Sequence, residues 1–274
     1  MPTSPSRASL FSQRVERGLG GEDLAREGAE VVLLVDTFNR YFEPENGRAA
    51  ERVLTRAGYR VLSADPASGR PLCCGRTFLS AGLVDEARSE GRRMLDALTP
   101  HCAAGTPIVG LEPSCLLTLR DEYPAMLPGA QTRALAERAQ LFEEFVKSER
   151  TTGRFQLAMA PMEVRTALLH GHCHQKAFAT VGAAVAALEL IPGLTAETFP
   201  STCCGMAGSF GYESEHYEMS LKIGELGVLP KMRAAPSDTL LAANGTSCRH
   251  QIADVTGREA RHIVRILDAA SAGA

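Results

Sequence analysis

Ser201-Thr202-Cys203-Cys204-Gly205-Met206-Ala207-Gly208 places two adjacent cysteines directly before a glycine. Neighbouring cysteines rarely form a disulfide with each other, because the small ring strains the peptide between them. Two thiolates on one sharp turn instead suit a metal centre that takes several sulfurs. The glycine permits the positive φ that such a turn can require. This stretch therefore indicates a metal or redox site.

The same arrangement occurs a second time. Leu72-Cys73-Cys74-Gly75 is the other pair, and a third cysteine follows each pair, Cys115 in the first copy and Cys248 in the second. Corresponding cysteines of the two copies lie 130 and 133 positions apart. A repeat of this length is typical of a duplicated domain and is too long for a solenoid.

Composition limits the class of protein. The 274 residues suit about two domains, and the net charge of −3 gives no indication of a nucleic-acid partner. No apolar run reaches the roughly 18 residues of a transmembrane helix, and we see no secretory signal. We expect a cytoplasmic protein that reaches the inner membrane, if at all, through partners. Thiols stay reduced in the cytosol, so we interpret the cysteines of this chain as metal or redox sites rather than as disulfides.

Buried-strand patterns alternate with helix patterns along the chain. The continuous apolar run Glu30–Val35 is typical of a parallel strand that is buried on both faces. The alternation predicts an α/β fold with parallel sheets. We expect strands at 30–35, 59–62, 107–111, 167–169, 195–199 and 239–243. We expect helices at 46–57, 84–98, 176–188 and 213–226 and a bridging helix over 135–146. Two further helices are expected to begin at Cys115 and at Cys248.

These elements predict two tandem Rossmann-like domains related by pseudo-twofold symmetry. We expect an N-terminal tail or linker at 1–28, the first domain at 29–130, a bridging helix and linker at 131–164, and the second domain at 165–274. Each cysteine site follows an expected strand and precedes an expected helix, the edge where open α/β sheets bind ligands. A helix N-terminus also favours thiolate over thiol. The cysteines concerned are Cys73, Cys74 and Cys115 in the first half, and Cys173, Cys203, Cys204 and Cys248 in the second.

Four thiolates suit an iron–sulfur cluster or a closed tetrahedral zinc site. Structural zinc sites usually use short Cys-x-x-Cys knuckles, whereas these ligands come from three distant loops. The first half offers three cysteines, with Asp36 in the place that Cys173 takes in the other copy. Three interpretations of that half are open. It holds a metal with a carboxylate ligand, it holds a weaker centre, or it is a vestigial copy without metal.

Six segments resemble the cysteine-rich (CCG) domain family. The family includes a subunit of heterodisulfide reductase, iron–sulfur subunits of glycolate oxidase and anaerobic glycerol-3-phosphate dehydrogenase, and lactate-utilisation proteins. The likeness is closer still to the C-terminal portion of FAD-linked D-lactate and glycolate dehydrogenase-type iron–sulfur proteins, and it covers about residues 30 to 270. The segments are Val35–Pro44, Leu72–Arg76, Gly110–Cys115, His170–Ala177, Cys203–Gly211 and Ser247–Arg249.

The resemblance implies a cluster of the 4Fe-4S type. Its implied ligands are Cys173, Cys203, Cys204 and Cys248 in the second half and Cys73, Cys74 and Cys115 in the first, with Asp36 and Glu112 as further candidates. Glu112 and Gly245 stand where the fuller motif has another cysteine. This departure argues against the five-cysteine clusters of heterodisulfide reductase and favours a four-cysteine centre in the second half.

The resemblance further implies electron transfer. The chain would carry electrons from an FAD-linked 2-hydroxy-acid dehydrogenase partner, with a ferredoxin-like iron–sulfur module, to a quinone or another acceptor. FAD would be bound only by the partner, so we expect a split-gene subunit or a C-terminal piece that is not catalytically complete alone. Two other interpretations remain, a structural or regulatory zinc-binding subunit and a thiol–disulfide reductase acting through Cys203 and Cys204.

Several neighbouring residues have simpler interpretations. His172 and His174 are expected to hydrogen-bond backbone rather than to bind metal. Arg76 and Lys176 either stabilise an anionic centre or are solvated surface charges. Cys102 has no counterpart in the other half and is interpreted as an ordinary thiol. Glu112 could equally cap the helix that Cys115 opens, and the Cys203/Cys204 group could be a buried apolar thiol pair.

Overall fold

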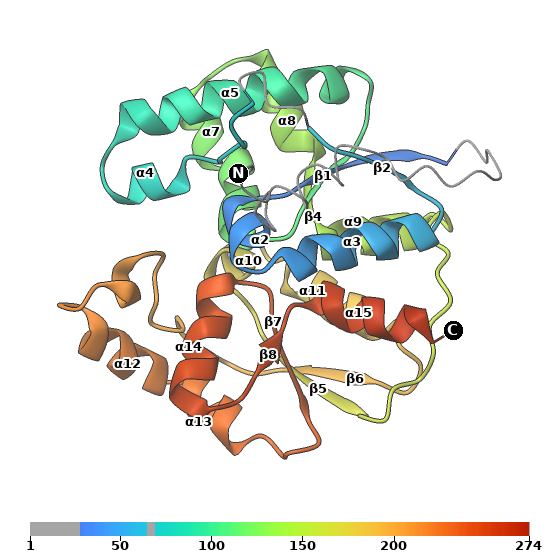
Figure 1. The fold of residues 1–274 in the computed structure, drawn as a ribbon, viewed down its shortest axis with the longest axis vertical. Coiled ribbons are helices and arrows are strands. Elements are labelled where there is room, and N and C mark those ends of the chain that lie inside the picture. The colour runs from blue at the N-terminus through green and yellow to red at the C-terminus, as the bar shows by residue number, and fades with distance from the viewer. Residues whose placement is uncertain (1–27, 65–68, 274) are drawn as a thin grey trace, which may run out of the picture.

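The computed structural model describes residues 28–64 and 69–273, so the predicted tail at 1–28 lies, except for its last residue, outside the described residues. The chain forms two four-stranded sheets with the orders β2-β1-β3-β4 and β6-β5-β7-β8 (Figure 1). All neighbouring strands are parallel. The predicted α/β class with two tandem Rossmann-like sheets is confirmed. The strands are β1 Glu30–Leu34, β2 Arg60–Leu62, β3 Ile108–Gly110, β4 Ala139–Leu141, β5 Thr166–His170, β6 Thr195–Thr198, β7 Leu240–Ala243 and β8 Ala260–Arg261.

Strand β1 shows why the sheets are covered on both faces. Val31 and Leu33 enter one hydrophobic cluster and Val32 and Leu34 enter another, as the alternation of side chains along a strand requires. The continuous apolar run is therefore explained by burial of both faces.

Helices form three layers around the two sheets. The helices α3, α9, α11 and α15 lie between the sheets, while α5 to α8 cover the outer face of the first sheet and α13 and α14 the outer face of the second (Figure 1). The helices are α2 Thr37–Tyr41, α3 Pro44–Arg56, α4 Arg76–Ser80, α5 Val84–Ala103, α6 Pro113–Arg120, α7 Glu122–Met126, α8 Ala130–Arg138, α9 Phe142–Thr151, α10 Cys173–Ala177, α11 Val181–Leu188, the 3-10 turn Phe210–Tyr212, α12 Tyr217–Glu225, α13 Val228–Ala234, α14 Thr246–Thr256 and α15 Ile263–Ala272.

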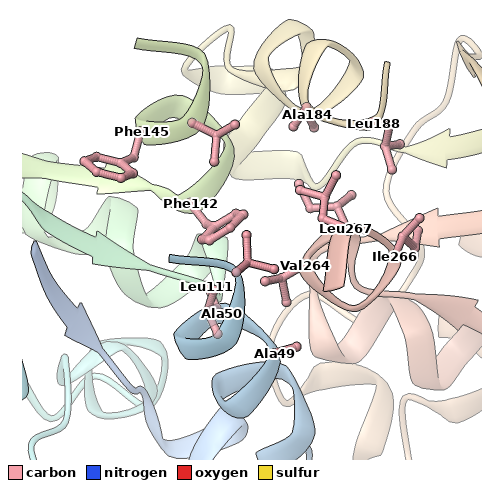
Figure 2. Close-up of a cluster of buried hydrophobic side chains, with 14 of the residues drawn as sticks. Ala49, Ala50, Leu111, Phe142, Phe145, Ala184, Leu188, Val264, Ile266 and Leu267 are labelled. Atoms are coloured by element: carbon pink, nitrogen blue, oxygen red, sulfur yellow. The ribbon is translucent and has the colours of Figure 1, made fainter. Parts of the chain in front are cut away.

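The middle layer is a core that both halves share. Figure 2 shows Phe142 and Phe145 of α9 together with Ala184 and Leu188 of α11 and with side chains of α3 and α15. Ion pairs close its solvent edge, where Asp268 of α15 accepts hydrogen bonds from Arg52 at 2.6 Å and from Arg56 at 2.8 Å. The two sheets are therefore packed against each other through helices of both.

The predicted continuous helix over 135–146 is wrong. Residues 139–141 instead form β4, which pairs with β3 and lies between α8 and α9. Pairing satisfies backbone groups of β3 that would otherwise form an open edge, and Ala139 and Leu141 become buried. The division into two domains stays a proposal, and β4 lies inside the segment predicted as a linker.

Other boundaries also differ from the predictions. The predicted helix at 46–57 begins instead at Pro44, and the Asn46 side chain donates to Asn39 at 2.9 Å instead of capping the helix. The predicted helix at 176–188 is two helices, because Ala179 between them has a φ of 56°. The predicted helix at 213–226 begins at Tyr217. The predicted strands agree with β1, β2, β3, β5, β6 and β7 to within a few residues.

Across the described ranges, no helix combines the length and the apolar character needed to cross a bilayer.

The shared core predicts a large effect of Phe142→Ala. The side chain is fully buried between the halves, so its removal should lower the free energy of unfolding by roughly 3–5 kcal/mol. Urea denaturation followed by circular dichroism measures this change. Phe42→Ala is the matched control, because Phe42 is 65% exposed and should change stability by no more than about 0.5 kcal/mol. Equal effects of both substitutions would contradict a core shared by the two halves.

Candidate metal centre

Three loops at one edge of the second sheet carry four cysteines. Cys173 is the first residue of α10, and Cys248 is the third residue of α14. Cys203 and Cys204 lie in the loop that follows β6, where Gly205 has a φ of 97°. A Cβ on Gly205 would lie 2.0 Å from the carbonyl oxygen of Ser220, so only glycine fits this turn.

The four sulfurs form a continuous chain. Cys173 lies beside Cys203 and interacts with it electrostatically, Cys203 adjoins Cys204 in the chain, and the sulfurs of Cys204 and Cys248 lie 3.2 Å apart. Cys204 and Cys248 are buried, whereas Cys173 and Cys203 are half-buried. The structure therefore places the four cysteines in loops at one sheet edge, with the sulfurs of Cys204 and Cys248 in direct contact, and their joint role as ligands stays a prediction.

Hydrogen bonding favours two thiolates in this chain. A hydrogen bond from Cys173 and a second from Cys204 hold the pKa of Cys203 far below its usual range. A hydrogen bond from Cys204 lowers the pKa of Cys248, and the nearby imidazoles of His170 and His172 lower it further against the effect of burial. The same interactions raise the pKa of Cys173 and of Cys204. Thiolates are the form of cysteine that binds metal.

The first half repeats the arrangement with three sulfurs. Cys73 hydrogen-bonds Cys74, which hydrogen-bonds Cys115, the third residue of α6. Gly75 has a φ of 80°, and its amide donates to the Cys73 sulfur at 3.5 Å, as the Gly205 amide does to Cys203 at 3.3 Å. The two cysteine pairs therefore sit on the same kind of turn.

The electrostatics of the first half are different. The hydrogen bond from Cys74 lowers the pKa of Cys115, but burial and the carboxylates of Asp36 and Glu112 outweigh it and leave the value at about 11. The pKa of Cys73 is raised by its bond to Cys74 and by burial, and the pKa of Cys74 is raised mainly by its bond to Cys115. All three groups therefore favour the thiol.

Asp36 caps a helix, as His172 does in the second half. Its side chain accepts hydrogen bonds from the amides of Phe38 and Asn39 and from the Asn39 side chain at 2.6 Å, and burial with the nearby Glu112 raises its pKa to about 6. His172 is the N-cap of α10 and accepts from the His174 amide at 3.2 Å. The predicted correspondence of Asp36 with Cys173 is therefore wrong by one residue.

Thr37 holds the place of Cys173. It is the first residue of α2, as Cys173 is the first residue of α10, and it hydrogen-bonds Cys73 as Cys173 bonds Cys203. The sequence analysis did not identify Thr37. The available signal was a residue with a hydroxyl group directly after Asp36, at the end of the expected first strand.

Glu112 caps α6 and reaches the other half of the chain. One oxygen accepts from the Ser114 amide at 3.3 Å and from the Ser114 hydroxyl at 2.8 Å. The other oxygen accepts from the amide of Thr246, at the start of α14, at 2.9 Å. The predicted capping role is confirmed, and the contact with α14 is new. At the corresponding place, a Cβ on Gly245 would lie 2.4 Å from the His172 ring, which explains the glycine.

The basic residues near the cysteine loops join separate segments. Lys176 donates to the carbonyl oxygens of Ser201 at 2.9 Å and Thr202 at 2.8 Å, just before the cysteine pair. Arg76 forms an ion pair with Glu122, and its guanidinium lies 3.2 Å from Nε2 of His174 in the other half. Cys102 packs inside the outer core of the first half, away from both cysteine groups.

Glu143 of α9 is hydrogen-bonded to α10 and to Asn244, which precedes α14. One oxygen accepts from Gln175 at 2.5 Å and from Asn244 at 2.9 Å, and the Gln175 oxygen accepts from the His172 amide at 2.9 Å. The other oxygen has no hydrogen-bond partner among residues 28–64 and 69–273. Burial raises the pKa of Glu143 to about 7.

His170 is a site residue that sequence reasoning missed. It is the last residue of β5, and its ligand atom lies within 4.8 Å of the Cys204 and Cys248 sulfurs. Its position at the strand end, three residues before Cys173, was the available signal.

The parallel α/β sheets and paired cysteine turns define a cysteine-rich domain. Residues 37–120 match the cysteine-rich domain family, and the predicted resemblance is confirmed.

Three relatives illustrate how the chain compares with known proteins. It is 25% identical over 241 residues to a subunit of anaerobic glycerol-3-phosphate dehydrogenase of Escherichia coli, covering 87% of this chain and 58% of the relative. It is 31% identical over 249 residues to D-2-hydroxyglutarate dehydrogenase of Pseudomonas putida, covering 89% and 22%. It is 25% identical over 262 residues to lactate utilization protein A of Geobacillus kaustophilus, covering 88% and 99%. The chain thus spans little more than half of the first relative and less than a quarter of the second.

The two-helix contact of Glu112 predicts that Glu112→Ala destabilises the protein without loss of bound metal. The substitution leaves the buried Thr246 amide without its acceptor, which should cost about 1–3 kcal/mol in the free energy of unfolding. Both oxygens already accept hydrogen bonds, so metal content by mass spectrometry should stay unchanged. Glu86→Ala, at an exposed position in the first turn of α5, is the control. Loss of metal in Glu112→Ala alone would identify Glu112 as a ligand.

Burial of Glu143 predicts a pH-dependent stability. Because the pKa is raised in the folded state, to about 7, the contribution of this group is fully present below its unfolded value and is lost as pH rises through about 7. Glu143→Gln should remove that loss, up to about 2–3 kcal/mol between about pH 5 and about pH 8. Urea unfolding of both proteins at the two pH values measures the difference. Parallel pH profiles would show that Glu143 titrates normally.

Proposed function

We propose that this chain is an iron–sulfur electron-transfer component, with its principal cluster held by Cys173, Cys203, Cys204 and Cys248. The observation that carries this proposal is the chain of four sulfurs contributed by three loops at one sheet edge. Ligands that converge from separate loops suit a cluster better than they suit a short zinc knuckle.

The residues of the second half fit such a group. The donor set has four sulfurs, and hydrogen bonding already favours thiolates at Cys203 and Cys248. A buried histidine, His170, offers a ring nitrogen within 4.8 Å of the Cys204 and Cys248 sulfurs. When bound, an iron–sulfur cluster of the 4Fe-4S type would accept and release one electron at a time.

The surrounding residues hold and tune the sulfurs. The amides of Gly205 and Ala207 hydrogen-bond the Cys203 sulfur, and such bonds stabilise negative charge and tune the reduction potential. Lys176 fixes the loop in front of the cysteine pair. Cys204 and Cys248 are buried, so they would lie on the side of the cluster away from water. Cys173 and Cys203 are half-buried and would lie on the side nearer to solvent, where electrons would enter or leave.

We propose a flavin-dependent dehydrogenase of the 2-hydroxy-acid type as the electron donor. Two of the relatives are named as a dehydrogenase or part of one, and a third is named for lactate utilization. FAD would be bound by the donor, a ferredoxin-like module would complete the chain of carriers, and a quinone or another carrier would accept the electrons. Any contact with the inner membrane would be made through these partners.

The first half is proposed as a weaker centre. Its three sulfurs all favour the thiol, and two carboxylates lie close to them. Cys73, Cys74 and Cys115 would therefore release protons less readily to a metal than the second group does.

Metal analysis with cysteine variants tests the proposed function. Anaerobically purified protein should contain iron and acid-labile sulfide and should give an EPR signal that changes on dithionite reduction. Cys203→Ser should remove most of that signal and of the visible absorbance, because it removes a thiolate ligand, whereas Cys73→Ser should retain most of both. Cys102→Ser is the matched control for a buried thiol outside the sites and should leave both unchanged. Stoichiometric zinc without iron, persisting after anaerobic reconstitution, would overturn the electron-transfer proposal.

A further inference from the structure

Glu143 is a buried acidic residue that is not among the proposed cluster ligands. It lies in the first turn of α9, and its side chain is fully buried. One oxygen, Oε1, accepts hydrogen bonds from Gln175 at 2.5 Å and from Asn244 at 2.9 Å. Both donors are neutral amides, so neither supplies a positive charge that would balance a carboxylate.

The second oxygen of Glu143 has no hydrogen bond. Oε2 is buried and finds no partner in residues 28–64 or 69–273. A carboxylate that is buried and held only by amide groups loses its hydration, whereas the neutral acid loses much less. Burial accordingly raises the pKa of Glu143 to about 7, so this side chain exchanges a proton near neutral pH.

The carboxyl group is joined to two segments that carry proposed cluster ligands. Gln175 lies two residues after Cys173 in α10, and Asn244 lies four residues before Cys248 of α14. Each segment is therefore one side-chain hydrogen bond away from Glu143. A charge on the cluster and a charge on this carboxyl would interact through the protein interior, where screening by water and salt is weak.

Other titratable groups lie on α9 and α10. Glu144, the next residue of α9, raises the pKa of Glu143 and is itself paired with Arg120 at 2.8 Å. His172 caps α10, and its amide donates to the Gln175 side chain. Histidines titrate in the neutral range, so a test must separate His172 from Glu143.

The remaining elements around Asn244 contribute three further groups. Arg249 of α14 donates to the Asn244 carbonyl oxygen at 2.7 Å and is paired with Glu43. His262 precedes α15, and burial together with the charge of Arg249 lowers its pKa to about 3, so it is neutral near pH 7. From β5, His170 pairs across the sheet with the residue before Asn244.

We propose that Glu143 is a proton-binding site coupled to reduction of the second-half centre. The inference rests on the proposed function, because it concerns the same cluster. When one electron enters from the flavin-dependent donor, the Glu143 carboxylate takes one proton from solvent and becomes the neutral acid, so the net charge of the buried region is unchanged. When the electron leaves to the acceptor, the proton returns to solvent.

The pH dependence of the midpoint potential tests this coupling. Anaerobically reconstituted full-length protein is titrated with dithionite and followed by EPR between about pH 6 and about pH 9. We expect a constant potential below about pH 7 and a lower potential above it, because reduction then requires uptake of a proton. The limiting slope is tenfold in the reduction equilibrium constant for each pH unit, or about 59 mV for one electron.

Two glutamine variants assign the proton to a residue. Glu143→Gln keeps the shape of the side chain but cannot ionise, so its midpoint potential should be constant over the same pH range. Glu149→Gln is the matched control, because Glu149 is also a buried acidic residue of α9 but is paired with Arg154. This control should retain the wild-type pH dependence.

Infrared spectroscopy covers the case in which Glu143→Gln fails to assemble a cluster. The difference spectrum between reduced and oxidised wild-type protein, recorded above pH 7, should contain the carbonyl stretch of a newly protonated carboxylic acid. This band should shift when the protein is made with ¹³C-labelled glutamate. In Glu143→Asp, which keeps a carboxyl group, the labelled glutamate should no longer shift it.

The outcomes separate the two proposals. A cluster whose midpoint potential does not depend on pH would overturn the coupling and leave electron transfer intact. A pH dependence that persists in Glu143→Gln would assign the proton to another group, such as His172, and overturn the role of Glu143. A redox spectrum without a glutamate band would overturn it as well. Protein that binds no iron under anaerobic reconstitution would overturn the proposed function and this inference together.

Discussion

Two carboxylates of the first half hold the helix that carries Cys248, and the arrangement of both sites depends on these contacts. Glu43, which is half-buried, forms an ion pair with the buried Arg249 and accepts from the Thr246 hydroxyl at 2.9 Å. Glu112 accepts from the Thr246 amide in the same turn. Removing Glu43 would leave the buried Arg249 guanidinium without its partner, so these contacts constrain how the halves meet. The His262 ring adds a third link, with Nε2 3.2 Å from the Leu111 carbonyl.

The two halves show how one fold supports different cysteine chemistry. Both use a parallel sheet with the same strand order and a tight glycine turn. The first site is surrounded by the carboxylates Asp36 and Glu112, which disfavour further negative charge on sulfur. The second site has His170 and His172 nearby, and these imidazoles favour negative charge on the Cys248 sulfur. The neighbours of the sulfurs, rather than the cysteines themselves, therefore distinguish the sites.

Much of the fold could be predicted from the sequence because its signals are local. The apolar run of β1 and the placement of cysteines between strands and helices follow from short stretches. The strand β4 could not be predicted, since three residues inside an amphipathic pattern form a strand only because β3 offers an edge. The roles of Thr37 and His170 depend on where side chains point at a strand end, and the bond from Glu112 to Thr246 joins residues far apart in the chain. The predicted pseudo-twofold relation stays a prediction.

The position of α15 has a consequence for how the protein is made. This helix packs on α3, and Asp268 bonds Arg52 and Arg56, so a segment near the end of the described chain covers one near its start. More than 200 residues separate α3 from α15 along the chain. The part of α3 that α15 covers therefore stays exposed during synthesis until α15 has been made, and such transiently exposed apolar surface favours aggregation.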